Sequence, residues 1–147
     1  MALSASYNQL LTLSYIREES MISEFNPLLN ISVRPASDND VFIMAQLFHS
    51  TRLDFYQLGL PKATVNMLLQ QQYQLQQTSY QSQFPNSMDY ILCRQAKVIG
   101  KLSLAINPEY LHLVDLVLAP EVRSKGFGSA VLEALKYDAK VWLVPIR

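Results

Sequence analysis

One stretch of the chain limits its fold more than any other: Arg123-Ser124-Lys125-Gly126-Phe127-Gly128. It lies between an apolar segment, Leu111–Leu118, and an amphipathic one, Phe127–Asp138. The apolar segment is typical of a β-strand covered on both faces, and the amphipathic segment is typical of a surface helix. Glycines at the start of a helix leave backbone N–H groups accessible, and the helix dipole favours an anion there. The sequence therefore predicts a strand, an anion-binding loop and a helix, in that order.

Length and charge exclude several classes of protein. The chain has 147 residues, the size of one domain. Lys+Arg and Asp+Glu number 12 each, so the basic excess of a broad nucleic-acid or anionic-membrane surface is absent. A single cysteine, Cys93, excludes an internal disulfide, and no Cys/His spacing suits zinc. No apolar run approaches the roughly 18 residues of a transmembrane helix. We expect a cytoplasmic protein with no metal and no nucleic-acid or membrane partner.

The first half of the chain predicts one strand and two helices. Residues 1–30 carry only a weak pattern and are interpreted as an N-terminal extension. Ile31–Arg34 is a short strand, and Ser37 and Asp40 have the spacing of a capping box at a helix start. A second helix follows over Lys62–Tyr73. For the glutamine-rich segment Gln70–Gln83 we expect a helix end and a polar loop.

The second half predicts mainly strands. Tyr90–Cys93 and Val98–Ile106 have the pattern of two strands, joined by a turn at Gln95-Ala96-Lys97. Leu111–Leu118 and the helix after the loop come next, and Val141–Ile146 is predicted as one more strand. The order β-α-α-β-β-β-α-β indicates a single mixed α/β domain over residues 31–147.

The loop and its neighbours resemble the acetyl-coenzyme A signature of the GNAT N-acetyltransferase superfamily. The core of that signature, Arg/Gln-x-x-Gly-x-Gly/Ala, is matched by Arg123, Gly126 and Gly128. The order of elements over residues 31–147 also matches the family from its first strand to its fifth. The resemblance implies an α/β (α+β) fold with a GNAT-like mixed, mostly antiparallel sheet flanked by helices. It also implies a C-terminally short domain, since the family's last helix and last strand pair have no counterpart.

The resemblance further implies acetyl-CoA as co-substrate and direct transfer of its acetyl group to an amine acceptor, a small molecule or a protein. Backbone groups of Leu116, Val117 and Leu118 would pair with the pantetheine arm. The pyrophosphate would lie against Arg123, Ser124, Lys125, Gly126, Phe127, Gly128 and Ser129. No residue can be assigned to protonate the leaving thiolate. The alternative is a truncated, non-catalytic GNAT-like domain that binds CoA or acts through self-association.

Two side chains on the strand before the loop are candidates for a general base. A base is needed because an amine with a pKa of about 10.4 is almost fully protonated at neutral pH. His112 falls where some members of the family carry a glutamate, and Asp115 is the only carboxylate within the apolar strand, where burial raises a pKa. Three positions apart, they nominally face opposite sides of the sheet unless a bulge redirects one. Further polar candidates are Arg52, Tyr56 and Tyr90.

The predicted last strand raises a question of assembly. An apolar strand at Val141–Ile146 with no following partner would leave backbone groups unpaired at a sheet edge, where another chain can add. We expect this edge to be covered by a second copy, giving a homodimer, or by residues 1–30 folding back. A third reading is that the sequence belongs to a longer gene product.

Overall fold

The computed structural model of the chain describes residues 30–106 and 109–141. The predicted extension, apart from Asn30, lies outside the described residues, as do residues 142–146 of the predicted last strand and the dimer contact expected there. Val141, expected to begin that strand, is instead the last residue of helix α5 (Phe127–Val141). The prediction of a strand beginning at Val141 is therefore wrong, because the amphipathic pattern of α5 continues past its expected end at Asp138.

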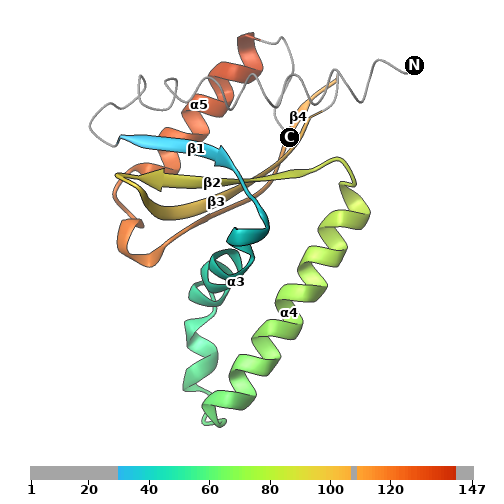
Figure 1. Ribbon diagram of the computed structural model, residues 1–147, viewed down its shortest axis with the longest axis vertical. Coiled ribbons are helices and arrows are strands. Elements are labelled where there is room, and N and C mark those ends of the chain that lie inside the picture. Colours follow the sequence, from blue (N-terminus) through green and yellow to red (C-terminus); the bar gives the residue numbers. More distant parts are fainter. Residues whose placement is uncertain (1–29, 107–108, 142–147) are drawn as a thin grey trace.

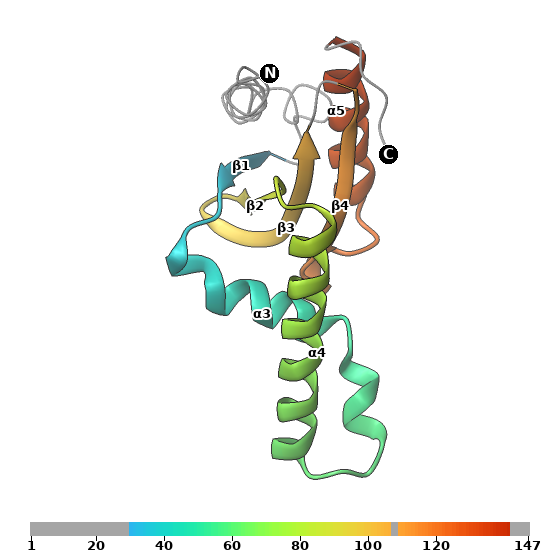
Figure 2. The same ribbon diagram turned by 90° about the vertical axis from the view of Figure 1, so that its right-hand side faces the viewer.

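A four-stranded antiparallel sheet forms the centre of the fold. Its strands lie in chain order: β1 (Ile31–Pro35), β2 (Met88–Arg94), β3 (Lys97–Ile106) and β4 (Leu111–Leu118). Figure 1 shows helices α3 (Val41–Ser50) and α4 (Lys62–Gln83) on one side of this sheet and α5 on the other, and Figure 2 gives the same arrangement from the side. The mixed α/β architecture with an antiparallel sheet and flanking helices confirms the predicted fold class.

The two faces of the sheet are chemically different. Toward α5, alternate residues of β2 and β3 are buried in the main apolar core with Val131, Ala134 and Leu135 of that helix; they are Tyr90, Leu92, Leu102 and Leu104. On the opposite face, toward α3 and α4, the polar side chains of Lys101 and Ser103 are buried beside Ile91. A buried lysine requires compensating partners, and these lie in the candidate site described below.

One buried carboxylate fixes the entry into α3. Asp40 accepts hydrogen bonds from Nη1 and Nη2 of Arg34, each at 2.7 Å, and from the Ser37 N–H at 2.8 Å. Ser37 Oγ accepts from the Asn39 N–H at 3.3 Å, which completes the predicted capping box one 3-10 turn before α3 begins. The Arg34 guanidinium, assisted by the Ser37 N–H, holds the pKa of Asp40 well below its usual range.

Asp40→Asn should lower the free energy of unfolding at neutral pH by about 1.5–3 kcal/mol, because a charged bidentate pair is lost. The depressed pKa makes this stabilisation complete above the unfolded-state value of about 3.9 and removes it as the pH falls through the folded-state pKa. Denaturant unfolding from neutral to acid pH measures both effects. The variant should lose less stability in acid than the wild type does. Asp38→Asn, which removes an exposed carboxylate of the same turn, is the control. An equal loss in both variants would contradict the role of Asp40.

Two local predictions are wrong. The glutamine-rich segment Gln70–Gln83 is not a loop but the second half of α4, which extends to Gln83. Glutamine is a good helix former, and no glycine or proline interrupts the segment. Between β2 and β3 the turn contains only Gln95 and Ala96, with φ of 51° and 65°, and Lys97 already belongs to β3. Positive φ at both positions matches the right-handed twist of the two strands. Among the helices of the described residues, α4 included, none combines the length and apolarity needed to cross a membrane.

Candidate active site

A bulge in β4 decides which of its side chains share a face. Ser103 pairs with Asp115, but the next residue of β3, Leu104, pairs with Leu113, so Val114 has no opposite partner. Residues directly opposite one another lie on the same face of a sheet. Asp115 is therefore on the face of Ser103, and His112, which pairs with Ala105, is on that face too. The two predicted bases are three positions apart and would face opposite sides of a regular strand. The bulge between them places both on the same face of the sheet.

A cavity of about 260 Å³ brings six predicted site residues together. It lies between β4 and the end of α3 and is lined by Asp115, Leu116, Val117, Leu118 and Arg123, together with Phe48, Thr51, Arg52 and Gln76. Successive side chains of a strand point to opposite faces of the sheet, so four consecutive residues cannot all line a cavity on one face. They can line one cavity together only where it borders the edge of the strand. Within the described sheet β4 is the last strand, and its edge forms this wall.

Asp115 has the properties of a proton acceptor. Burial raises the pKa of its carboxyl, while the ammonium of Lys101, 3.9 Å from Oδ2, and a hydrogen bond from the Leu116 N–H oppose the rise. A carboxyl in a cavity with a pKa shifted toward neutrality is suited to general-base chemistry.

Lys101 connects Asp115 to a second carboxylate. Its Nζ lies 4.0 Å from Oδ1 of Asp89, and the Lys101 side chain is only 3% exposed. Ser103 Oγ donates to the same Oδ1 of Asp89 at 2.5 Å. Sequence reasoning missed this group. The available signal was the alternation of polar and apolar residues in Lys101-Leu102-Ser103-Leu104, which turns two polar side chains to one face of a buried strand.

The loop before α5 has the geometry of an anion site. After the short 3-10 turn Pro120–Val122, Ser124 and Gly126 have φ of 61° and 86°. The hydrogen bond from the Ala130 N–H to the Gly126 carbonyl, at 3.0 Å, closes the first turn of α5. The N–H groups of residues 127–129 precede this bond and have no acceptor within the helix. Such a set of N–H groups at the positive end of a helix dipole binds anions.

Arg123 is engaged by the protein. Its Nε donates to the Leu118 carbonyl at 2.9 Å, and its Nη2 and Nη1 donate to Oγ and the carbonyl of Ser50 at 3.0 and 3.5 Å. These bonds join the loop to the end of β4 and to the last residue of α3. Arg123 thus positions the loop, and its direct contact with a cofactor stays a prediction.

The remaining candidates divide between the cavity and other surroundings. Arg52 lines the cavity, with its guanidinium 5.2 Å from the centre of the Phe48 ring. His112 packs on the Phe84 ring at 4.3 Å between ring centres and does not line this cavity. Outside the cavity, Tyr90 is buried in the core and the Tyr56 hydroxyl donates to Asn66. In the described part of the chain no cluster of three or more His, Cys, Asp or Glu side chains is placed to hold a metal ion.

The sequence matches the model of the family described as Acetyltransferase (GNAT) family over residues 46–142. The chain therefore belongs to the GNAT acetyltransferase family, and the resemblance seen in the loop Arg123–Gly128 is confirmed. The matched span contains every residue that lines the cavity, together with the loop and α5.

Several solved acetyltransferases are similar to the chain at low identity. The PaiA N-acetyltransferase from Thermoplasma acidophilum, solved with coenzyme A, is 19% identical with a TM-score of 0.49, over 75% of this chain and 72% of that chain. A GNAT family acetyltransferase from Staphylococcus aureus is 20% identical with a TM-score of 0.47, over 80% and 84%. A predicted acetyltransferase from Clostridium acetobutylicum, solved with acetyl-CoA, is 15% identical with a TM-score of 0.44, over 80% and 79%. No curated protein matches the sequence significantly. The family assignment rests on the match over residues 46–142.

Proposed function

We propose that the protein transfers an acetyl group from acetyl-CoA directly to an amine of a small molecule or a protein. The observation that carries this proposal is the meeting of Asp115, the edge of β4 and the start of the anion-binding loop at one cavity. Membership of the GNAT family, whose members are acetyltransferases, supports it.

The donor has groups that suit the edge of β4 at this cavity and the loop that continues from Arg123. The diphosphate of acetyl-CoA is an anion for the N–H groups of residues 127–129, and Lys125 is exposed beside them. The pantetheine arm contains two amide groups, which can pair with backbone groups along Leu116–Leu118 as an added strand does. This alignment brings the thioester toward Asp115, which precedes those three residues on β4.

The chemistry requires a neutral amine. Asp115 accepts a proton from the acceptor ammonium, and its raised pKa brings it closer to the pH of the reaction. The amine nitrogen then forms a bond to the thioester carbon, the carbon–sulfur bond breaks with its electron pair on sulfur, and the proton that the acylated nitrogen must still lose is taken up by the CoA thiolate, directly or through solvent. Backbone N–H groups of β4 supply hydrogen bonds to the thioester oxygen as it gains negative charge.

The test combines calorimetry with acetyl-CoA and an assay of free CoA thiol over a panel of amines. We expect acetyl-CoA to bind and thiol release to depend on the amine. Binding of acetyl-CoA without amine-dependent release of CoA thiol would contradict the proposed reaction and support the alternative, a non-catalytic domain that binds CoA. Absence of binding would overturn both the donor site and the proposed reaction.

A further inference from the structure

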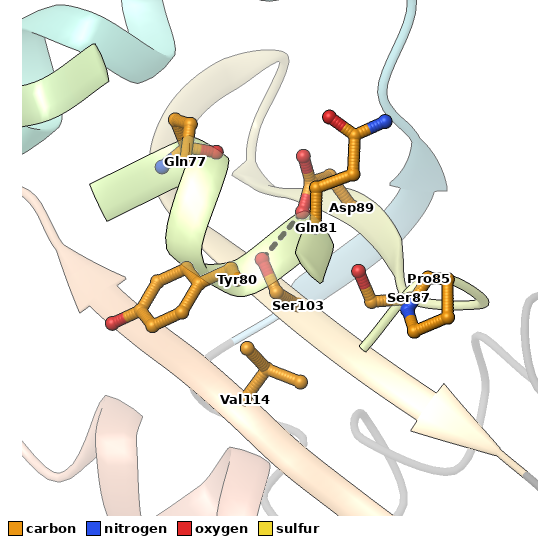
Figure 3. Close-up of a pocket in the computed structure, with 8 residues that line it drawn as sticks. All are labelled: Gln77, Tyr80, Gln81, Pro85, Ser87, Asp89, Ser103 and Val114. Carbon is orange, nitrogen blue, oxygen red and sulfur yellow. Dashed lines mark hydrogen bonds between the residues drawn. The ribbon is translucent and has the colours of Figure 1, made fainter. Parts of the chain in front are cut away.

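A second cavity, of about 240 Å³, adjoins the candidate active site on the face of the sheet toward α4. Its polar lining consists of Gln77, Tyr80, Gln81, Ser87, Asp89 and Ser103, drawn together in Figure 3. The two cavities are lined by successive residues of the same two elements. On β4, Val114 lines this one and Asp115 lines the active-site cavity; on α4, the corresponding residues are Gln77 and Gln76.

The charge in this second cavity is negative. Asp89 is its only ionisable carboxylate, and no lysine, arginine or histidine is among its lining residues. Lys101, the cation that approaches Asp89, also approaches Asp115, and the Arg52 guanidinium lines the neighbouring cavity beside Asp115. Since Lys101 is shared with Asp115 and Arg52 lines the other cavity, the Asp89 carboxylate is the charged group on this lining, and it favours a positively charged ligand.

Asp89 keeps part of its hydrogen-bonding capacity. The hydrogen bond from Ser103 and the approach of Lys101 both involve Oδ1, and within the described residues Oδ2 has neither. The carboxamide of Gln77 lines the same cavity, and its fully buried Nε2 has no acceptor among those residues. Because that nitrogen is fully buried, Gln77 contributes to the polarity of the lining and not a direct contact with a ligand. Oδ2 of Asp89 can thus accept an N–H bond from an ammonium group, and the Ser87 hydroxyl is a further acceptor on the lining of the same cavity.

We propose that the acceptor carries a second cationic group, as a short α,ω-diamine does, and that this second ammonium binds at Asp89 while the reacting amine lies at Asp115. This inference rests on the proposed function and names its substrate class. Lys101 Nζ is 4.0 Å from Asp89 Oδ1 and 3.9 Å from Asp115 Oδ2, so these two oxygens are within about 8 Å of each other. Two amines joined by a few methylene groups span such a separation.

The experiment compares putrescine, butylamine and γ-aminobutyrate, three amines of similar length whose far ends are cationic, apolar and anionic. Calorimetry of the full chain without acetyl-CoA should give binding of putrescine at least about tenfold tighter than that of butylamine, with γ-aminobutyrate weakest. In the transfer assay the same order should hold for kcat/KM. Equal affinities for putrescine and butylamine would overturn the inference.

Variants locate the effect. Asp89→Asn should reduce the preference for putrescine over butylamine by about tenfold, whereas Asp54→Asn, an exposed carboxylate elsewhere, should preserve it. Gln81→Glu adds a carboxylate to the lining of the cavity and should strengthen putrescine binding, which keeps the inference testable if Asp89→Asn does not fold. A preference that neither Asp89→Asn nor Gln81→Glu alters would overturn the site.

The two proposals fail in different ways. Tight putrescine binding that depends on Asp89, without transfer to any amine, would reject the enzymatic reaction and leave the diamine site intact. Transfer to butylamine and putrescine at equal kcat/KM would support the reaction and reject the diamine site.

Discussion

Asp115→Asn should lower kcat for acetyl transfer by about 10²- to 10⁴-fold, the usual contribution of a general base. Asparagine keeps the size of the side chain and can still accept from the Leu116 N–H, so the KM for acetyl-CoA should change much less. The loss should be smaller for a weakly basic acceptor that is already neutral at the pH of the assay, because such an amine needs no base. Steady-state kinetics with a strongly and a weakly basic amine measures this difference.

The pH profile gives a second measurement of the same role. Burial raises the pKa of Asp115, so the acid limb of kcat/KM should have its midpoint above the ordinary aspartate value of about 3.9. Activity should rise with pH through this midpoint, since the ionised carboxylate is the active form, and the limb should disappear in Asp115→Asn. His112→Asn is the comparison, because that ring packs on Phe84 outside the cavity. A greater loss in His112→Asn than in Asp115→Asn would assign the base to His112.

Gly126→Val should weaken acetyl-CoA binding by at least about a hundredfold, as expected for the loss of several hydrogen bonds to a charged diphosphate. Gly126 has φ of 86°, a conformation that β-branched residues strongly disfavour. Valine would move the backbone between Ser124 and α5, and the N–H groups of residues 127–129 would no longer converge. Titration calorimetry with acetyl-CoA measures the change.

Gly59→Val provides the matched control. Gly59 has φ of 79°, and a Cβ at either glycine would have open space around it, so the two substitutions impose a similar backbone strain. Gly59 lies between the short 3-10 helix Leu53–Gln57 and α4, away from the loop. Thermal unfolding should reveal comparable destabilisation in both variants, while only Gly126→Val loses affinity. Equal affinities would place the diphosphate elsewhere.

Elements whose signals are local were predictable from the sequence. Leu111–Leu118 is the strand β4 with the predicted bounds, because a nearly continuous apolar run between a turn and Pro120 has clear ends. The capping box at Ser37 and Asp40 was equally readable, because its hydrogen bonds join residues two and three positions apart. The continuation of α4 to Gln83 was not predicted. This helix is mostly polar and buries few side chains, so its amphipathic signal is weak.

Features that depend on distant partners were not predictable. The bulge at Val114 results from the pairing of β4 with β3, and one strand's sequence does not contain its partner's register. Arg123 was readable as part of a motif, but its hydrogen bonds to Ser50 join positions far apart in the chain. The same holds for Lys101, whose two carboxylates come from β2 and β4.

The chain order of the sheet also has a kinetic consequence. β2 joins β3 through Gln95 and Ala96, and β3 joins β4 through residues 107–110, so these strand pairs form between segments that are close in sequence. β1 and β2 are instead separated in the chain by the segment that contains α3 and α4, so their pairing closes a long loop. Closing a short loop costs less chain entropy than closing a long one, and contacts of low sequence separation speed folding. Nucleation of the sheet is thus cheapest in the β2–β3–β4 meander, the part that contains Lys101 and its two carboxylates.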